Sequence, residues 1–556
     1  MHRPIVPWVV LVGAIAIGCS RPSAIAPASS TSAEITPADL ERRLFLIAHD
    51  SMMGRETGSE GNFKSAEYVA SEFRRLGLAP AGEQGTYFQT IPFWRAAIDP
   101  ESRLDAGGRA LVLGRDFAPS NLAAAPRTLN GVPVIYGGSL SDSSRWISPA
   151  QAAGKVVVLD YPPNVPLRGG LAAPRWQGVA ALAVAALEQV SPEQLARLRE
   201  GRPVNDTARN PQAIPAMWIS RAAAATLLGG GPSTLTPGTE GVALRGRFDI
   251  ARTPVRYAAR NVVAVLLGSD PALRGQYVSL TAHNDHVGFD HSPVDHDSLR
   301  AFNRVVRPMG ADSPPRQPTS DEAARIRTIL DSLRRAHRPR LDSIRNGADD
   351  DGSGTVSLLE IAEAMSRGGT RPRRSILFVS HTAEEAGLLG SRWFTDHPTV
   401  PLDSVVAEID QDMIGRGTST DMPRGGTGAG NATYLEVIGA KRLSREFGEM
   451  VEAANAKQPV PFVFDYTYDA PGHPLQYYCR ADHYSYARYG IPSLAMSRGE
   501  HLDYHQVTDE PQYISYPDLA RVSRMVHDAA MAIANAPSRP KLDVPKPTDP
   551  NASCRQ

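Results

Sequence analysis

Cysteine is scarce in this sequence: Cys19, Cys479 and Cys554 are the only three among 556 residues. So low a count excludes a scaffold built on disulfides and a cysteine-rich metal site. Cys479 has no neighbouring residues that suggest a nucleophile, and we predict a buried free thiol at this position.

A charge excess of either sign is also missing, because 59 Lys and Arg residues balance 59 Asp and Glu residues. Nucleic-acid-binding proteins normally carry a basic excess or a basic stripe, so we expect no nucleic-acid partner. Apolar residues make up 42% of the chain and charged residues 21%. This composition permits a sizeable core and excludes wholesale disorder.

Apolar runs long enough to span a bilayer do not occur, and the one at Trp8–Gly18 is short. It follows Arg3 and precedes Cys19, which is typical of an export signal. The segment Ala16-Ile-Gly-Cys19 resembles a bacterial lipobox, which implies cleavage before Cys19 and lipidation of Cys19. We therefore predict a signal peptide over 1–18 and a flexible tether over 19–37. The protein is expected in the cell envelope, touching the membrane only through this anchor, or secreted after cleavage of an ordinary signal.

Strand and helix patterns divide the rest of the chain. Residues 256–536 alternate apolar strands with amphipathic helices, which predicts an α/β fold with a mostly parallel central sheet sandwiched by helices. Residues 38–125 are expected to form the N-terminal part of the same domain. The short strand patterns of 126–255 resemble an inserted protease-associated (PA) domain, with a generic αβ insert as the alternative. The proline-rich segment 537–556 is predicted to be a disordered tail.

Residues 289–344 interrupt the alternation of strands and helices. This segment is rich in His, Asp and Pro and ends in a charged helix that begins near Thr319–Glu322, a capping-box arrangement. Ile326 and Leu330 fall on one face of that helix. We predict a surface flap that borders the active site and limits substrate size.

Five clusters of potential metal ligands fall where strands are predicted to end. Loops that leave the carboxyl ends of parallel strands carry the chemistry of such folds. Neutral imidazoles and carboxylates bind zinc well, and a nearby carboxylate fixes the tautomer of a ligating histidine. The clusters contain His283 and Asp285, Asp349–Asp351, Glu384 and Glu385, Asp410 and Asp412, and Asp503–His505.

Together these clusters resemble the co-catalytic dizinc aminopeptidase family, which includes bacterial leucyl aminopeptidases, glutamate carboxypeptidases and catalytically inert transferrin receptors. The resemblance covers about residues 40–125 and 256–535. It implies two Zn²⁺ ions held by His283, Asp350, Glu385, Asp412 and His505. It also implies that Asp285 orients His283, that Glu384 is the general base and that Tyr504 polarises the scissile carbonyl.

The resemblance carries further expectations. A cis peptide bond is common after the residue that matches Asp350. The segment between His283 and Asp350 is longer than is usual in the family, which we attribute to the 289–344 insertion. Asp482-His483 matches a recurrent motif and is assigned a structural role. The remaining histidines near the motifs are expected to be surface or hydrogen-bonded groups rather than ligands: His286, His291, His296 and His381.

The predicted function is removal of N-terminal residues from peptides by a zinc-activated water with a glutamate base. A carboxypeptidase or dipeptidase of the same fold is an alternative, because Arg480 and Arg498 lie near the motifs and would suit a substrate carboxylate. A glutaminyl cyclase and an inactive receptor-like protein are two others. The complete ligand set argues against both.

Overall fold

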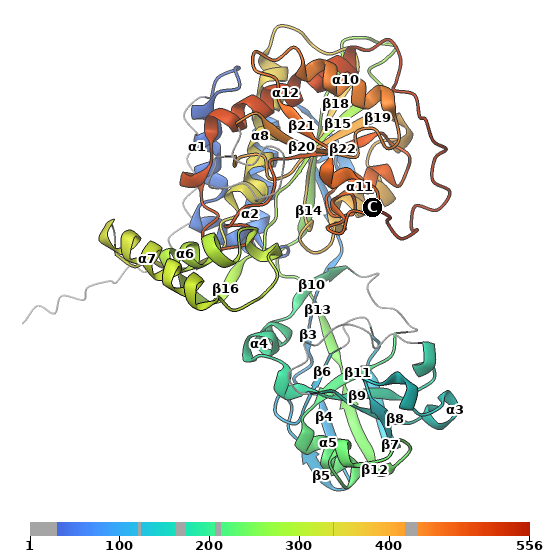
Figure 1. Cartoon of the computed structure of the whole chain (residues 1–556). Helices are drawn as coiled ribbons and strands as arrows, with labels where there is room; N and C mark the ends of the chain where they lie inside the picture. The colour runs from blue at the N-terminus through green and yellow to red at the C-terminus, as the bar shows by residue number, and fades with distance from the viewer. Residues whose placement is uncertain (1–30, 121–123, 163–173, 206–212, 337, 418–431) are drawn as a thin grey trace, which may run out of the picture. The chain divides into compact units, whose positions relative to one another are not determined.

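The computed structural model describes residues 31–120, 124–162, 174–205, 213–336, 338–417 and 432–556 (Figure 1). Residues Ser32–Gln556 form one compact unit. The predicted signal peptide, Cys19 and most of the predicted tether lie outside the described residues. No helix among the described residues is long and apolar enough to cross a membrane.

Among the described residues, the central sheet contains nine strands, the first being β1 and the last β22 in chain order. Its order is β1-β14-β18-β15-β19-β22-β20-β21, and β2 also pairs with β14. The middle strands β18, β15, β19 and β22 are parallel, whereas β14 and β20 run antiparallel to their inner neighbours. The strands are β1 Ala79–Pro80, β2 Phe88–Ile91, β14 Ala259–Leu266, β15 Tyr277–His283, β18 Ser375–His381, β19 Val405–Gln411, β20 Tyr434–Ile438, β21 Val463–Asp465 and β22 Ser493–Ser497.

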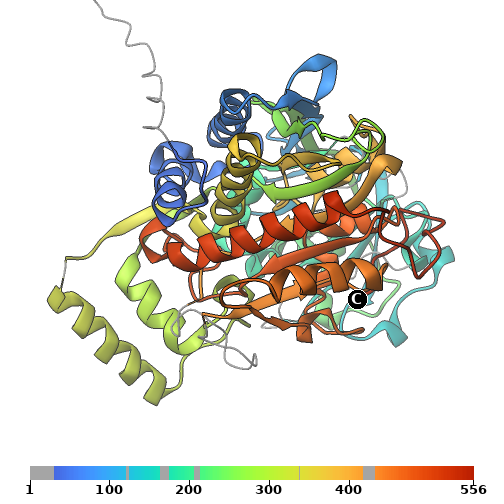
Figure 2. The same cartoon turned by 90° about the horizontal axis from the view of Figure 1, so that it is seen from above.

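Helices cover both faces of this sheet, which confirms the predicted α/β sandwich. One face packs on α1 (Pro37–Ile47), α2 (Glu60–Arg75), α8 (Gly354–Arg367), α10 (Arg445–Asn455) and α12 (Tyr516–Asn535). Figure 2 shows α12, the long red helix, beside α10. The other face packs on α9 (Leu389–Asp396) and α11 (His483–Ala487) through Phe394 and Tyr486. Both faces of the middle strands are buried, which explains their continuous apolar sequences.

A second β-rich body, here called the β lobe, occupies residues 93–254. Its larger sheet has eight strands: β4 Arg103–Ala106, β5 Arg109–Leu111, β6 Phe117–Pro119, β7 Arg127–Ser139, β8 Val156–Asp160, β9 Ala181–Ala185, β11 Ala216–Ile219 and β12 Glu240–Phe248. A smaller sheet joins β3 (Phe93–Ile98), β10 (Arg202–Asn205) and β13 (Ile250–Pro254). Its helices are α3 Pro149–Ala152, α4 Pro192–Glu200 and α5 Arg221–Leu228. The predicted boundary at residue 126 was too late, because β4 and β6 pair with strands of the predicted insert.

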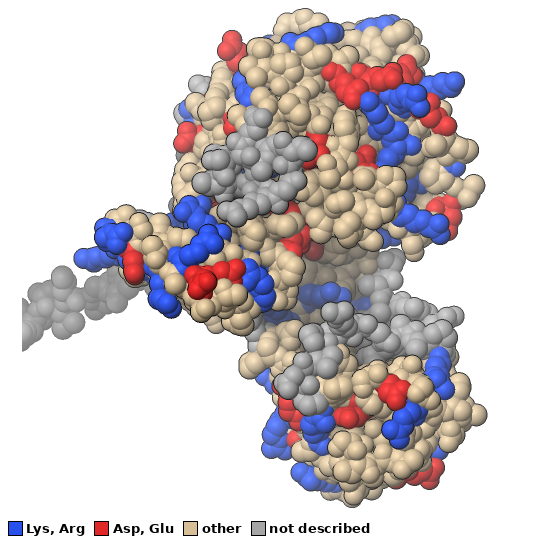
Figure 3. Space-filling model, viewed as in Figure 1, with Lys and Arg blue, Asp and Glu red and all other residues tan. Residues whose placement is uncertain are grey.

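The segment 289–344, here called the α6–α7 insertion, leaves the domain on β16 (Phe289–Asp295) and returns on the antiparallel β17 (Leu341–Ile344). Between them lie α6 (His296–Val306) and α7 (Ser320–Ala336). The Thr319 side chain accepts a hydrogen bond from the Glu322 N–H and the Glu322 carboxylate accepts one from the Thr319 N–H, so the predicted capping box is present. Acidic and basic side chains are interspersed on the face of the insertion seen in Figure 3.

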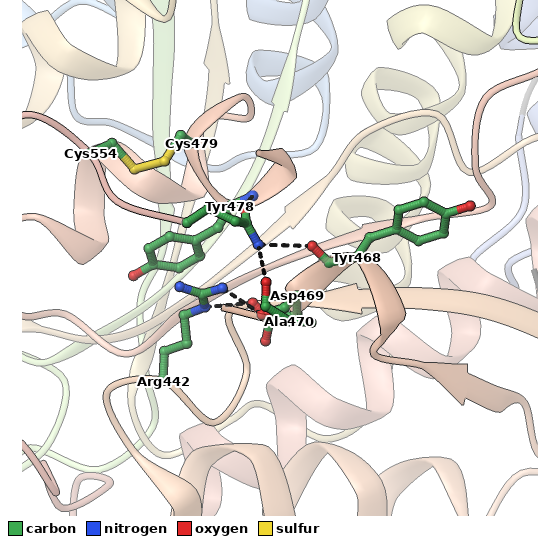
Figure 4. The surroundings of a disulfide bond; sticks show 8 residues. Arg442, Tyr468, Asp469, Ala470, Tyr478, Cys479 and Cys554 are labelled. Carbon is green, nitrogen blue, oxygen red and sulfur yellow. Dashed lines mark hydrogen bonds and ion pairs between the residues drawn. A yellow bond between two sulfur atoms is a disulfide. The ribbon is translucent and has the colours of Figure 1, made fainter. Parts of the chain in front are cut away.

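The C-terminal segment is not the disordered tail that we predicted. Cys554 forms a disulfide with Cys479, so the predicted free thiol at Cys479 is also wrong (Figure 4). The Gln556 side chain accepts a hydrogen bond from the Tyr478 N–H and donates one to the Tyr468 carbonyl. Sequence spacing gave no indication of this pairing, because 75 positions separate the two cysteines.

Candidate active site

The five predicted ligands meet at the carboxyl-terminal edge of the parallel strands. His283 ends β15, Glu385 and Asp412 follow β18 and β19, and His505 lies in the loop after β22. Asp350 comes from the turn that precedes α8. This convergence follows from the parallel pairing of β18, β15, β19 and β22, which brings four strand ends together.

Asp350 stands at the centre of the cluster. Its Oδ1 lies 3.2 Å from His283 Nε2, and its Oδ2 lies 2.9 Å from His505 Nε2. Among the described residues, three groups of potential ligands have atoms within 4.8 Å of one another, and the two at this site both include Asp350. One group is His283, Asp350 and Asp412, and the other is His286, Asp350, Glu385 and His505.

The donor atoms of these groups fit metal ions. Buried polar atoms are normally hydrogen-bonded, so buried atoms without a partner need an explanation. Among the described residues, several atoms aimed into the cluster have no hydrogen-bond partner: His283 Nε2, His286 Nδ1, Asp350 Oδ2, Glu385 Oε1 and Asp412 Oδ1. Imidazole nitrogens and carboxylate oxygens are the ligands that zinc takes.

His286 corrects one sequence prediction. We expected a surface or hydrogen-bonded histidine, but His286 is 1% exposed and its ring nitrogens lack hydrogen-bond partners among the described residues. Its Nδ1 lies 2.8 Å from Glu385 Oε1 and 3.6 Å from Asp350 Oδ2. Its position three residues after His283 was the signal in the sequence. His381, by contrast, is hydrogen-bonded as expected, to the Tyr486 hydroxyl.

Asp285 lies behind His283. Its Oδ1 lies 3.6 Å from His283 Nδ1. The same Oδ1 accepts a hydrogen bond from the Glu384 N–H, and Oδ2 accepts one from the Thr57 hydroxyl. The same ring nitrogen lies 3.2 Å from the Asp285 carbonyl oxygen. These contacts favour a proton on His283 Nδ1 and leave Nε2 free to face Asp350 and Asp412.

Glu384 lies beside the ligands without belonging to either group. Its Oε2 is 4.0 Å from His283 Nε2. Burial raises the pKa of Glu384 well above its ordinary value, and Glu385 and Asp412 add to this while His283 opposes it. Burial would also raise the pKa of its neighbour Glu385, but His505 and His286 favour the carboxylate and lower that pKa to about 2. Adjacent glutamates thus differ in their electrostatic environment.

The backbone is unusual around the ligands. The Asp350–Asp351 peptide bond is cis, as the resemblance implied. His505 itself, Ala383 before Glu384, and Met413 after Asp412 have positive φ angles of 56°, 60° and 57°. Non-glycine residues in this region cluster at functional sites, where the surrounding structure holds them in place.

A cavity opens beside Asp350, Glu384, Asp412 and His505, and Tyr504 lines it. The Tyr504 ring stacks on the His505 ring with centroids 4.0 Å apart, so its position is tied to that of a proposed ligand. Glu436 and Glu500 also line this cavity. Neither residue was predicted from the sequence, because Glu436 lies within a strand and Glu500 in an ordinary polar loop.

The two arginines considered for a substrate carboxylate are engaged elsewhere. Arg480 lines the cavity, but its Nη1 lies 2.7 Å from Asp312 Oδ2. Arg498 is fully buried, and its guanidinium donates to the Ala432 and Gly417 carbonyls. Asp482 and His483 are buried, and the His483 N–H donates to Asp410 Oδ2, in keeping with a structural role.

Part of this chain matches the model of a known protein family. The matched segment includes the strands and loops that carry all the proposed ligands. Residues 261–530 belong to peptidase family M28. The M28 domain begins in β14 and ends within α12.

Individual relatives of the M28 domain are distant. Leucine aminopeptidase 1 of Penicillium rubens is 32% identical over 199 residues, which cover 34% of this chain and 48% of the relative. Leupeptin-inactivating enzyme 1 of Streptomyces exfoliatus is 38% identical over 78 residues, 14% of this chain and 18% of the relative. The chain thus spans about half the length of the leucine aminopeptidase that it matches.

Solved structures similar to the whole chain include two aminopeptidases. BSAP, a zinc aminopeptidase from Bacillus subtilis, has 17% sequence identity and a TM-score of 0.48, covering 90% of this chain and 95% of its own. The aminopeptidase from Aneurinibacillus sp. strain AM-1 has 16% identity and a TM-score of 0.48, covering 92% of this chain and 97% of its own.

Proposed function

We propose that this chain is a dizinc aminopeptidase that hydrolyses the first peptide bond of peptide substrates. The observation that carries the proposal is the position of Asp350 between two sets of ligand atoms, His283 and Asp412 on one side and His286, Glu385 and His505 on the other. A carboxylate placed between two sets of ligand atoms would suit a pair of metal ions bound side by side. The names of the leucine aminopeptidase relatives support the same reading.

In this proposal Glu384, Tyr504 and Asp285 have separate roles in the reaction. Bound zinc supplies Lewis acidity and lowers the pKa of water toward neutrality. Glu384 accepts a proton from the attacking water and delivers it to the leaving amine. The Tyr504 hydroxyl donates to the carbonyl oxygen of the scissile bond as negative charge develops, a contribution of about 3 kcal/mol for one such donor. Asp285 holds His283 in the tautomer that presents Nε2 to the site.

The contacts of the arginines favour an aminopeptidase over a carboxypeptidase. A carboxypeptidase needs a cation available to the substrate's terminal carboxylate. Arg480 is paired with Asp312, and Arg498 lies buried among backbone carbonyls. A glutaminyl cyclase or an inactive receptor-like protein is disfavoured because every proposed ligand position keeps a ligating residue type.

The test is a substrate panel with the zinc-loaded protein. We expect hydrolysis of aminoacyl p-nitroanilides and of unblocked peptides from the N-terminus, and no hydrolysis of N-acetylated peptides. Glu384→Gln is the matched control for contaminating peptidases. Cleavage of N-blocked peptides from the C-terminus, or cyclisation of glutaminyl peptides, would contradict the proposal.

We also propose that the protein is exported and anchored through lipidated Cys19. The basic residue, short apolar run and cysteine at the N-terminus support this. Cys19→Ser is expected to move the protein from the membrane fraction to the soluble fraction of cells. A Cys19→Ser protein that stays in the membrane fraction would count against lipidation.

A further inference from the structure

The cavity beside the proposed metal ligands has an acidic wall that the reaction itself does not use. Glu436 on β20 and Glu500 after β22 line the same cavity as Asp350, Glu384 and Tyr504. Glu436 is 1% exposed and Glu500 is 6% exposed. Neither residue lies in either group of potential metal ligands.

Each of these carboxylates keeps a free oxygen. Glu436 Oε1 accepts the Tyr434 hydroxyl over 2.8 Å, but Glu436 Oε2 has no hydrogen-bond partner among the described residues. Glu500 Oε2 is likewise buried without such a partner in the described part of the chain. Two buried acceptors left open in a cavity that reaches the reaction centre indicate a ligand with hydrogen-bond donors.

The charges around the cavity are not balanced by the protein. Arg480 is the only lysine or arginine among the described lining residues, and Asp312 of the α6–α7 insertion already pairs with it at 2.7 Å. Arg480 Nη1 lies 3.8 Å from Glu500 Oε1. Burial raises the pKa of Glu436 to about 8 and that of Glu500 to about 7, so an incoming cation would favour the ionised forms of both.

We propose that this cavity receives the side chain of the substrate's N-terminal residue and selects a cationic one, lysine or arginine, through Glu436 and Glu500. Tyr477 and Ile438, which also line the cavity, contact the aliphatic stem of that side chain. Substrates with a free basic N-terminal residue are therefore the preferred class. This inference rests on the aminopeptidase function proposed above.

The experiment compares lysyl, arginyl, norleucyl and leucyl p-nitroanilides on the zinc-loaded protein. Norleucine matches the lysine stem without its charge, so the ratio of kcat/KM for lysyl over norleucyl substrate isolates recognition of the cation. We expect a ratio of at least about 10 in the wild type, the discrimination that one charged hydrogen-bond pair provides. In Glu436→Gln and Glu500→Gln the ratio should fall about tenfold or more. Glu449→Gln, on the exposed face of α10, should keep the wild-type ratio.

The outcomes separate this inference from the proposed function. A wild type that prefers norleucyl or leucyl substrates would overturn the inference and leave the aminopeptidase intact. Equal losses on lysyl and norleucyl substrates would show that the acids bind the α-amino group instead. No turnover of any aminoacyl substrate by zinc-loaded protein would contradict the proposed function. If a variant fails to fold, the wild type still tests the inference. Its inhibition constant should be lower for lysinamide than for norleucinamide, and equal constants would overturn the inference.

Discussion

The main-chain N–H of Glu384 donates a hydrogen bond to Asp285 Oδ1 over 3.1 Å. The carboxylate beside His283 thus also fixes the backbone of the residue proposed as the base. A single buried aspartate therefore links a potential metal ligand to the proposed base.

Asp285→Asn tests this link. The amide keeps the shape of the carboxylate but weakens its hold on His283 Nδ1, so zinc affinity should fall about 10–100-fold. Competition with a chelator measures the affinity. Thr57→Val, which removes only the hydroxyl that donates to Asp285, should lower the affinity less. Equal affinity in Asp285→Asn and wild type would contradict the assigned role.

The disulfide gives a stability prediction. The free energy of unfolding of the double variant Cys479→Ser/Cys554→Ser should be about 2–5 kcal/mol lower than that of the wild type, because the bond joins residues 75 positions apart and so constrains the unfolded chain. Thermal unfolding with and without a reductant measures the difference. The reductant should lower the Tm of the wild type and leave that of the double variant unchanged. An unchanged wild-type Tm after full reduction of the disulfide would contradict the prediction.

Burial of Glu436 and Glu500 predicts a dependence of stability on pH. Both ordinary pKa values are 4.5, and burial raises them to about 8 and about 7 in the folded protein. Tyr434 opposes the shift of Glu436, whereas Asp465 and Glu500 add to it. Asp312 adds to the shift of Glu500, and Tyr477 and Arg480 oppose it.

Between pH 4.5 and these raised values, Glu436 and Glu500 bind more protons in the folded state than in the unfolded state. Their contribution to the free energy of unfolding should therefore fall as pH rises through this window, by up to about 1.4 kcal/mol per pH unit for each group. Glu436→Gln and Glu500→Gln each remove one of these groups. The Tm of either variant minus that of the wild type should become more positive from pH 5 to pH 8. A constant difference would show that the carboxylate titrates normally.

The α6–α7 insertion holds the loop that carries Tyr504 and His505. Asn303 Nδ2 donates to the Leu502 carbonyl over 2.8 Å, and the Ala311 N–H donates to the Tyr504 carbonyl over 3.1 Å. Asn303→Ala should cost about 1–3 kcal/mol of stability by leaving a buried carbonyl unpaired, and should lower kcat on a small aminoacyl substrate. Ser332→Ala, exposed on α7, is the matched control. Unchanged kcat in Asn303→Ala would show that the insertion does not support the loop.

The sequence predicted the sheet well because its middle strands carry continuous apolar runs. Strands β15, β18 and β19 are three of these runs, and they lie within residues 256–536, where the pattern predicts alternating strands and helices. The ligand types at the ends of such strands then converge, since parallel strands bring their ends to one edge. The five predicted ligands therefore come together in the structure.

Other features had no local signal. Cys479 and Cys554 meet only because the C-terminal segment returns across the domain, which periodicity does not encode. Glu436 faces the cavity from the middle of a strand whose sequence resembles any buried strand. His286 is a partial exception: it follows His283 by three residues in the sequence, but only the fold shows that it lies beside Asp350 and Glu385.

The adjacent residues Glu384 and Glu385 are proposed to have different roles. Glu385→Ala should lower the zinc content as well as activity, because Glu385 is proposed to bind the metal. Glu384→Gln keeps the shape of the side chain but removes the base. The decisive measurement is kcat of Glu384→Gln together with its zinc content. We predict a loss of about 10²–10⁴-fold in kcat with zinc content and Tm near wild type. A Glu384→Gln protein with full zinc that keeps more than about a tenth of wild-type kcat would show that Glu384 is not the base.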